Sequence, residues 1–115
     1  MKRLLFVAAA ACSLVWHFGL YPKWESEVAE TASIRSINKD LAAYNGKRVM
    51  VTGYVEGRIS VLGVSAFTLS DGGQEVIDVA GLVKAPEPGN KTTVTGRLNL
   101  VKYFEGQNMP VIIVN

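Results

Sequence analysis

Few side chains in this 115-residue chain could carry out catalysis or bind a metal ion. The single histidine, His17, and the single cysteine, Cys12, both lie in an apolar N-terminal run, so the rest of the chain lacks the usual zinc and copper ligands. A nucleophilic serine would need an adjacent base, and no histidine follows His17. Asp71 and Asp78 form a conceivable carboxylate pair, but Asp71 precedes Gly72 in a predicted turn. We therefore expect a binding protein rather than an enzyme, with no catalytic residue, metal site or cofactor.

Aromatic and basic residues offer a different chemistry, the stacking of nucleobases beside phosphate contacts. The residues with flat rings or permanent positive charge that could form such a surface are Tyr54, Arg58, Arg97, Tyr103 and Phe104. Gln107 lies in the same predicted loop as Phe104. Under the alternative interpretation, one of the two adjacent aromatic residues closes the protein core and the other shields it.

The distribution of charge disfavours nucleic acid as a partner. The formal net charge is +2, and Lys2 and Arg3 account for it. From Lys23 to the C-terminus, ten Lys or Arg residues balance ten Asp or Glu residues. Phosphate backbones attract clustered positive charge, which this part of the chain lacks overall.

Residues 56–65 form an unexpectedly apolar predicted loop, with the sequence EGRISVLGVS. One interpretation is a hydrophobic tip that binds a protein partner or a membrane surface. The other is that the segment extends the flanking strands into a longer hairpin, with half of its side chains packed inward. The candidate partner- or ligand-binding residues are Arg58, Ile59, Val61, Leu62, Tyr103, Phe104 and Gln107.

Residues 4–20 contain no formal charge, and the basic pair Lys2 and Arg3 precedes them. A helix from Leu4 to Tyr21 would be about 27 Å long, close to the hydrocarbon thickness of a bilayer. Three aromatic residues at its far end suit the membrane interface: Trp16, Tyr21 and Trp24. Basic residues at the near end favour a cytoplasmic N-terminus.

We therefore expect residues 1–24 to be a single-pass anchor in the cytoplasmic (inner) membrane, with residues 4–21 in the bilayer. The N-terminus would lie inside and the remainder in the periplasm or another extracytoplasmic space. Two alternatives stay open: lipidation of Cys12 in the run Ala9-Ala10-Ala11-Cys12, and cleavage of the segment as a signal peptide. Residues 25–32 would be a linker, and residues 33–115 would form one small domain.

The spacing of apolar residues predicts one short helix followed by five strands. From Ser33 to Tyr44 the apolar positions are three or four residues apart, as on one face of a helix that Thr31 or Ser33 could cap. Alternating apolar residues or apolar runs predict the strands 49–55, 66–70, 75–79, 91–103 and 110–114. Asp71-Gly72 supplies the turn between the second and third strands.

A faint internal repeat relates Gly46–Gly53 to Gly89–Gly96, at an offset of 43 residues, and both copies end in Val-Thr-Gly. A glycine inside a strand is typical of a sharp bend or bulge. Two bent strands in a five-stranded domain indicate a small closed barrel.

The run from Ser33 to Asn115 resembles the bacterial extracytoplasmic OB-fold domains of the anticodon-binding-like group. The elements that carry the resemblance are Tyr44, Gly46 to Val55, Phe67 to Gly72, Pro86 to Gly89 and Val94 to Gly96. The resemblance implies a mainly β, five-stranded OB barrel that binds through its second and third strands and the neighbouring loops. The plan is also similar to that of the haem chaperone of cytochrome c maturation, but the histidine that holds haem beyond that barrel has no counterpart here.

These observations favour a non-enzymatic, membrane-tethered OB-fold interaction module, an accessory subunit or assembly factor of a membrane protein complex. The alternative is a protein of the cell envelope that binds single-stranded nucleic acid or an oligosaccharide. A third interpretation is an envelope lipoprotein with a small ligand, which would begin at Cys12.

Overall fold

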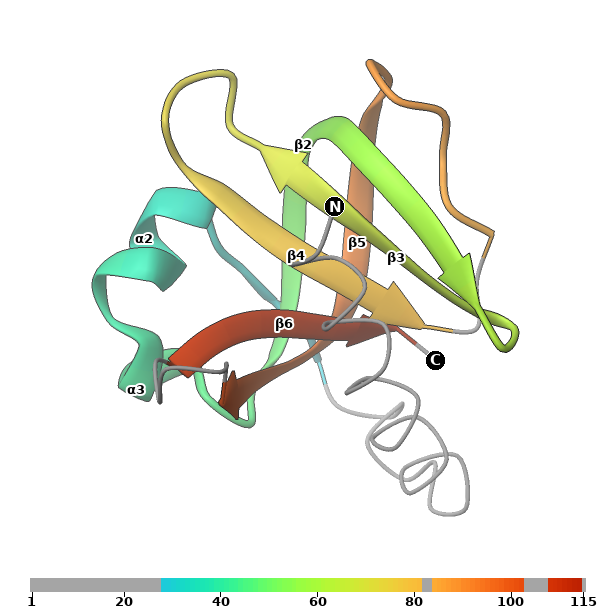
Figure 1. Ribbon diagram of the computed structural model, residues 1–115. Helices are drawn as coiled ribbons and strands as arrows, with labels where there is room; N and C mark the ends of the chain where they lie inside the picture. The colour runs from blue at the N-terminus through green and yellow to red at the C-terminus, as the bar shows by residue number, and fades with distance from the viewer. Residues whose placement is uncertain (1–27, 82–83, 103–107, 115) are drawn as a thin grey trace.

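The computed structural model describes residues 28–81, 84–102 and 108–114 (Figure 1). These residues form β1 (Glu30–Thr31), α2 (Ile34–Lys39), α3 (Leu41–Tyr44), β2 (Arg48–Val61), β3 (Val64–Ser70), β4 (Val76–Gly81), β5 (Lys91–Lys102) and β6 (Asn108–Val114). The prediction of a mainly β domain is confirmed. Within the described ranges no helix is long and apolar enough to cross a membrane. The anchor predicted for residues 1–24, with Trp16, Tyr21 and Trp24, lies outside the described residues.

The sheet closes on itself because the long strand β2 pairs with β3 through one half and with β5, the last strand of the sheet, through the other half. The strand order is β1-β2-β3-β4-β6-β5, and β2 also pairs with β5. The first half of β2 lies antiparallel to β5, from Arg48 opposite Arg97 to Tyr54 opposite Lys91, and the second half lies antiparallel to β3. All five predicted strands are therefore present, joined in a ring of pairings.

A sixth strand, β1, lies in the predicted linker 25–32. It is parallel to β2, with Glu30 opposite Val49, and the amide of Ala32 continues the pairing by donating to the carbonyl of Met50 at 3.1 Å. This strand is held by backbone hydrogen bonds, and both of its side chains are exposed. The sequence therefore carries no alternation that would have predicted it.

The prediction of one continuous helix over residues 33–44 is wrong, because Asp40 interrupts it. This residue has φ −145° and ψ 71°, and it ends α2 by donating its amide to the carbonyl of Ile37 at 3.2 Å. Its carboxylate begins α3 by accepting from the amide of Ala43 at 3.3 Å. Aspartate competes for backbone donors in this way, which makes it a better cap than interior residue. Ser33 caps α2 through the amide of Ser36.

Residues 56–65 are not a loop. β2 continues through them to Val61, and a two-residue turn at Leu62 and Gly63 leads directly into β3. The pairing register shifts by one residue between Val55 and Gly57, a β-bulge that exchanges which side chains face inward. The longer-hairpin interpretation of this segment is therefore the correct one.

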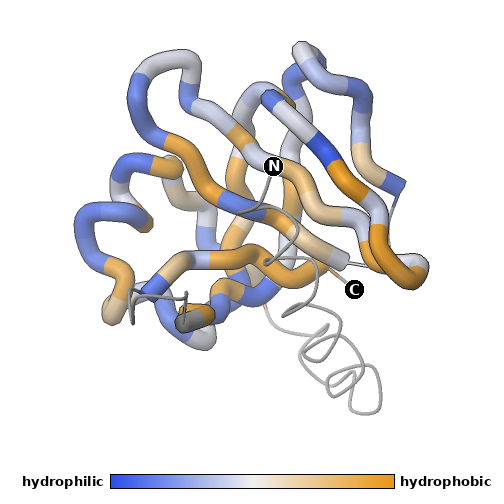
Figure 2. Tube along the Cα trace, viewed as in Figure 1, coloured by the Kyte–Doolittle hydropathy of each residue, from blue (hydrophilic) through white to orange (hydrophobic). Residues whose placement is uncertain are grey.

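Two separate apolar clusters lie on opposite faces of the sheet. The interior cluster combines Ile34 and Ile37 of α2 with inward-facing strand residues such as Phe67, Leu98 and Ile112. The second cluster, on the outer face, consists of Val64, Ala66, Ala80, Met109, Val111 and Ile113, with Ile59, Val61 and Val101 packed against it. Figure 2 shows the apolar stretches along β6 and at the tip of the β2–β3 hairpin.

Candidate interaction surface

The tip of the β2–β3 hairpin exposes one large apolar side chain. Leu62 is 88% exposed, whereas Ile59 and Val61 are half-buried against the second cluster and Val64 is buried. Of the apolar residues predicted to form a hydrophobic tip, Leu62 alone projects into solvent. Its backbone has φ 51°, the left-handed region that side chains with a Cβ rarely adopt.

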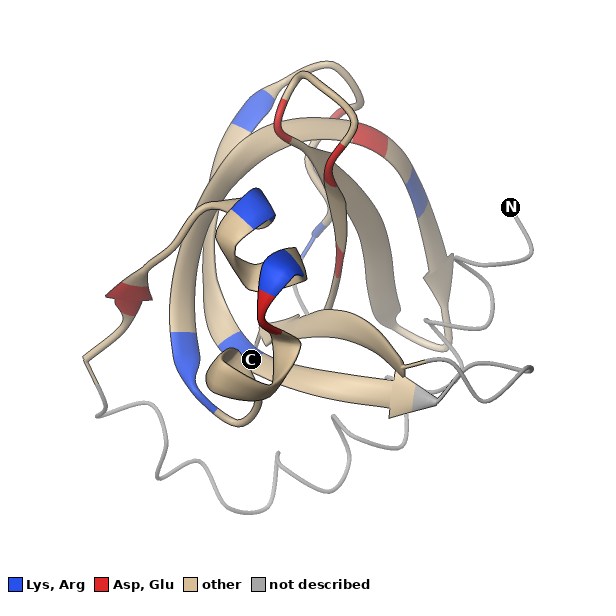
Figure 3. Ribbon diagram, turned by 90° about the vertical axis from the view of Figure 1, so that its left-hand side faces the viewer, with Lys and Arg blue, Asp and Glu red and all other residues tan. Residues whose placement is uncertain are grey.

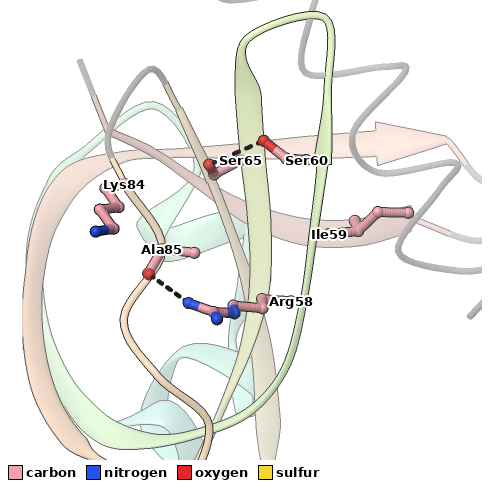
Figure 4. Close-up of a pocket in the computed structure, with 6 residues that line it drawn as sticks. All are labelled: Arg58, Ile59, Ser60, Ser65, Lys84 and Ala85. Carbon is pink, nitrogen blue, oxygen red and sulfur yellow. Dashed lines mark hydrogen bonds between the residues drawn. The ribbon is translucent and has the colours of Figure 1, made fainter.

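Arg58 links the hairpin to the segment that leads from β4 to β5. Its Nη1 donates to the carbonyl oxygen of Ala85 at 3.1 Å, and its Nη2 pairs with the Glu87 carboxylate at 3.1 Å (Figure 4). The bulge places Arg58 opposite Phe67, on the inward face at the open end of the ring. The guanidinium therefore braces a loop across that end, and its charge is already paired.

A hollow of about 280 Å³ lies beside this brace, lined by Arg58, Ile59, Ser60, Ser65, Lys84 and Ala85. The hydroxyl oxygens of Ser60 and Ser65 are 3.5 Å apart, and Figure 4 shows Lys84 beside Ala85, apart from the two serines. Lys84 has no ion-pair partner among the described residues. The residues that line the hollow thus include one lysine and two serines.

The predicted stacking and phosphate surface is not assembled by the described residues. Arg97 lies opposite Arg48, at the start of β2, and donates to the carbonyl oxygen of Gly46. Arg58 lies ten residues further along β2, roughly 33 Å of strand away. Figure 3 shows basic and acidic segments interspersed around the ring. Tyr54 is 44% exposed, with the ammonium group of Lys91 6.0 Å from its ring centre.

Tyr103, Phe104 and Gln107, the other predicted members of the binding surface, lie outside the described residues.

Asp71 and Asp78 do not form a carboxylate pair. The Asp71 carboxylate accepts from the amide of Gly73 at 2.7 Å within the exposed turn between β3 and β4. Asp78 is buried on the outer face, where its carboxylate accepts from the Thr68 hydroxyl at 3.0 Å. The described ranges contain no group of three or more His, Cys, Asp or Glu residues that could hold a metal ion.

Two surface features were not predicted from the sequence. One is a hollow of about 300 Å³ between β1 and β2, lined by Thr31, Ala32, Ser33, Met50 and Thr52. The other is the apolar outer face of β3, β4 and β6. A signal for the second was available, since 111–114 is an unbroken apolar run, the pattern of a strand that is buried on both faces.

Comparison with known proteins shows the fold. No protein-family model matches the chain, and no curated protein matches it significantly. A solved chain described as an aspartyl-tRNA synthetase from Leishmania major Friedlin is similar over 75% of this chain and 20% of its own length, at 9% identity and a TM-score of 0.58. An OBody bound to hen egg-white lysozyme is similar over 76% of this chain and 91% of its own, at 18% identity and a TM-score of 0.56. The chain spans a fifth of the synthetase's length, so this likeness concerns one domain. The described part of this protein therefore has an OB fold.

Proposed function

We propose that this protein is a non-enzymatic interaction module, tethered to the cytoplasmic membrane by residues 4–21, and that the β2–β3 hairpin binds a subunit of a membrane protein complex. The observation that carries the proposal is the exposure and the backbone conformation of Leu62. This residue combines 88% exposure with a left-handed backbone conformation at the tip of the β2–β3 hairpin.

The backbone conformation of Leu62 lowers stability, and the exposure of its side chain offers no compensation. A two-residue turn with positive φ at both positions favours Asn-Gly, and a residue with a branched apolar side chain costs roughly 1–2 kcal/mol in this conformation. Exposure of the side chain recovers none of that cost through burial. Residues held in unfavourable conformations cluster at functional sites, and an exposed leucine at such a position is explained by a partner that buries it.

The tether and the charge balance favour a protein partner at the membrane. Residues 4–20 carry no formal charge, with aromatic residues at the far end, and residues 23–115 contain equal numbers of basic and acidic side chains. Arg97 lies beside the start of β2, whereas Arg58 lies near the end of that strand. These two residues therefore do not form the basic groove that single-stranded nucleic acid needs.

Site-specific photocrosslinking tests the hairpin directly. A benzophenone amino acid is placed at position 62 of the full-length chain in its native membrane, and a matched one at position 93, an exposed threonine of β5. We expect position 62 to give one discrete adduct with an integral membrane protein that also co-purifies with the unmodified chain in mild detergent. Position 93 should give none.

A free monomer that shifts labelled single-stranded DNA at physiological salt would contradict the proposal and support the nucleic-acid alternative. Intact-mass measurement of the same preparation separates the uncleaved anchor from a lipidated form that begins at Cys12 or a cleaved form.

A further inference from the structure

Five side chains on the outer face of β3, β4 and β6 are shielded from solvent although they point away from the interior. They form the outer patch: Val64, Ala66, Ala80, Val111 and Ile113. Each is at most 1% exposed. Their strand neighbours Phe67, Val79 and Ile112 belong to the interior cluster, and the register places Ala66 opposite Ala80 and Ala80 opposite Ile113. The outer patch is therefore one continuous surface.

The elements that cover the interior do not account for this shielding. The apolar residues of α2, α3 and the 84–90 segment that join a cluster are Ile34, Ile37, Leu41, Tyr44 and Ala85, and all of them join the interior one. Every residue of the second cluster comes from a strand. An apolar sheet face becomes this dry only when another segment packs over it.

We propose that the outer patch is a docking surface for an apolar helix, and that residues 4–21 of this chain occupy it when they are not in a bilayer. The segment precedes Val28, the first described residue, and it carries no formal charge. A helix over residues 4–20 is about 26 Å long. The second cluster runs across five neighbouring strands, from Ile59 of β2 to Val101 of β5, roughly 19 Å measured across the sheet, so a helix that crosses the strands would contact it along most of its length.

The same segment cannot cover the outer patch and span a membrane at once. Insertion of residues 4–21 into the bilayer therefore uncovers the patch. This insertion rests on the proposed function, whereas the docking of residues 4–21 does not. Until the protein is in its membrane, residues 4–21 cover a sheet face that would otherwise promote aggregation.

Cys12, the only cysteine, lies within the proposed occupant and provides the test. Ala80→Cys and Ala66→Cys each place a second thiol on the outer patch with little change in volume, and Thr93→Cys places one on an exposed part of β5 as the control. The full-length variants are synthesised in a cell-free system with and without phosphatidylcholine–phosphatidylglycerol liposomes. They are then oxidised with copper phenanthroline, which joins two thiols that lie in contact, and crosslinked peptides are identified by mass spectrometry.

Without liposomes we expect an intramolecular crosslink from Cys12 to the patch cysteine in most molecules of the Ala80→Cys and Ala66→Cys variants. Thr93→Cys should give at least tenfold less. With liposomes the crosslink should fall at least tenfold. Far-ultraviolet circular dichroism of each variant establishes that it is folded, and the two patch variants provide independent readings if one of them unfolds.

Absence of the intramolecular crosslink in a folded patch variant without liposomes would overturn the docking, as would a crosslink between two chains, which would identify a second copy as the occupant. A crosslink that persists with liposomes, in a chain that stays in the supernatant, would overturn the tether of the proposed function and leave the docking intact. The two failures are therefore distinguishable.

Discussion

Val51 of β2 lies directly opposite Val94 of β5, and the two residues occupy equivalent positions in the 43-residue repeat. On either side of this pair, Val49 faces Gly96 and Gly53 faces Thr92. The two copies of the repeat therefore pair antiparallel with each other about a local twofold axis through the two valines. The second glycine of each copy marks a close approach, because an added Cβ would lie 2.8 Å from the Ser70 oxygen at Gly53 and 2.3 Å from the Ile113 oxygen at Gly96.

Gly96→Ala should destabilise the domain strongly. Its Cβ would lie 2.3 Å from the backbone oxygen of Ile113, a strand atom that cannot move aside without breaking the β5–β6 pairing. We expect a loss of about 3 kcal/mol or more in the free energy of unfolding, measured by urea denaturation. Gly73→Ala is the control, since its Cβ would meet only the flexible Asp71 side chain, and it should change stability by less than about 1 kcal/mol. Equal losses in the two variants would contradict the close-approach explanation.

The strands were predictable because their side chains alternate between a packed and a solvated face. The alternation from Val49 to Val55 matches the observed burial residue by residue, and Gly72 has the positive φ that the predicted turn requires. These features are local, so a single sequence contains them.

The rest depended on contacts that lie far apart in the chain. The backbone pairing of Glu30 with Val49 has no side-chain signature, and the break at Asp40 follows from capping preferences that outweigh the apolar spacing around it. The continuation of β2 past Glu56 was only one of two open interpretations, because the bulge changes which residues face inward and the alternation does not continue in register. The brace between Arg58 and Glu87 joins residues 29 positions apart that only the closed sheet brings together.

Leu62→Asn should raise stability and weaken partner binding at the same time. Asparagine tolerates the left-handed conformation of this turn, so we expect a gain of about 1 kcal/mol, or a rise of roughly 4–8 °C in Tm. The same change removes the exposed apolar side chain and should lower recovery of the membrane complex at least tenfold. Val28→Asn is the matched control, because Val28 is also highly exposed but lies far from the hairpin in the chain. A stabilised variant that still binds its partner would show that Leu62 is not part of the interface.

Thr68→Val should cost more stability than Thr52→Val, although each change removes one threonine hydroxyl from a hydrogen bond between strands. Thr68 donates to the Asp78 carboxylate, which is 0% exposed, whereas Thr52 shares a hydrogen bond of 2.7 Å with Thr93 in solvent. A buried acceptor that loses a donor cannot replace it with water, so we expect a loss of about 1–3 kcal/mol for Thr68→Val and about 0.5 kcal/mol for Thr52→Val. Thermal unfolding of both variants gives the comparison. Equal effects would show that water reaches Asp78 in the folded protein.

Arg58→Met should loosen the 84–90 segment without unfolding the domain. The variant keeps much of the aliphatic length of the side chain but loses the donors to Ala85 and Glu87. The Arg58 side chain is 37% exposed and that of Glu87 is 69% exposed, so the ion pair itself contributes less than about 1 kcal/mol to stability. We expect hydrogen exchange in a peptide covering residues 84–90 to rise severalfold, while the denaturation midpoint changes little. Glu87→Gln retains the bond from Arg58 to the Ala85 carbonyl and an amide oxygen as acceptor, so its exchange should rise less. If the two variants exchange equally, the ion pair rather than the bond to Ala85 holds the segment across the end of the ring.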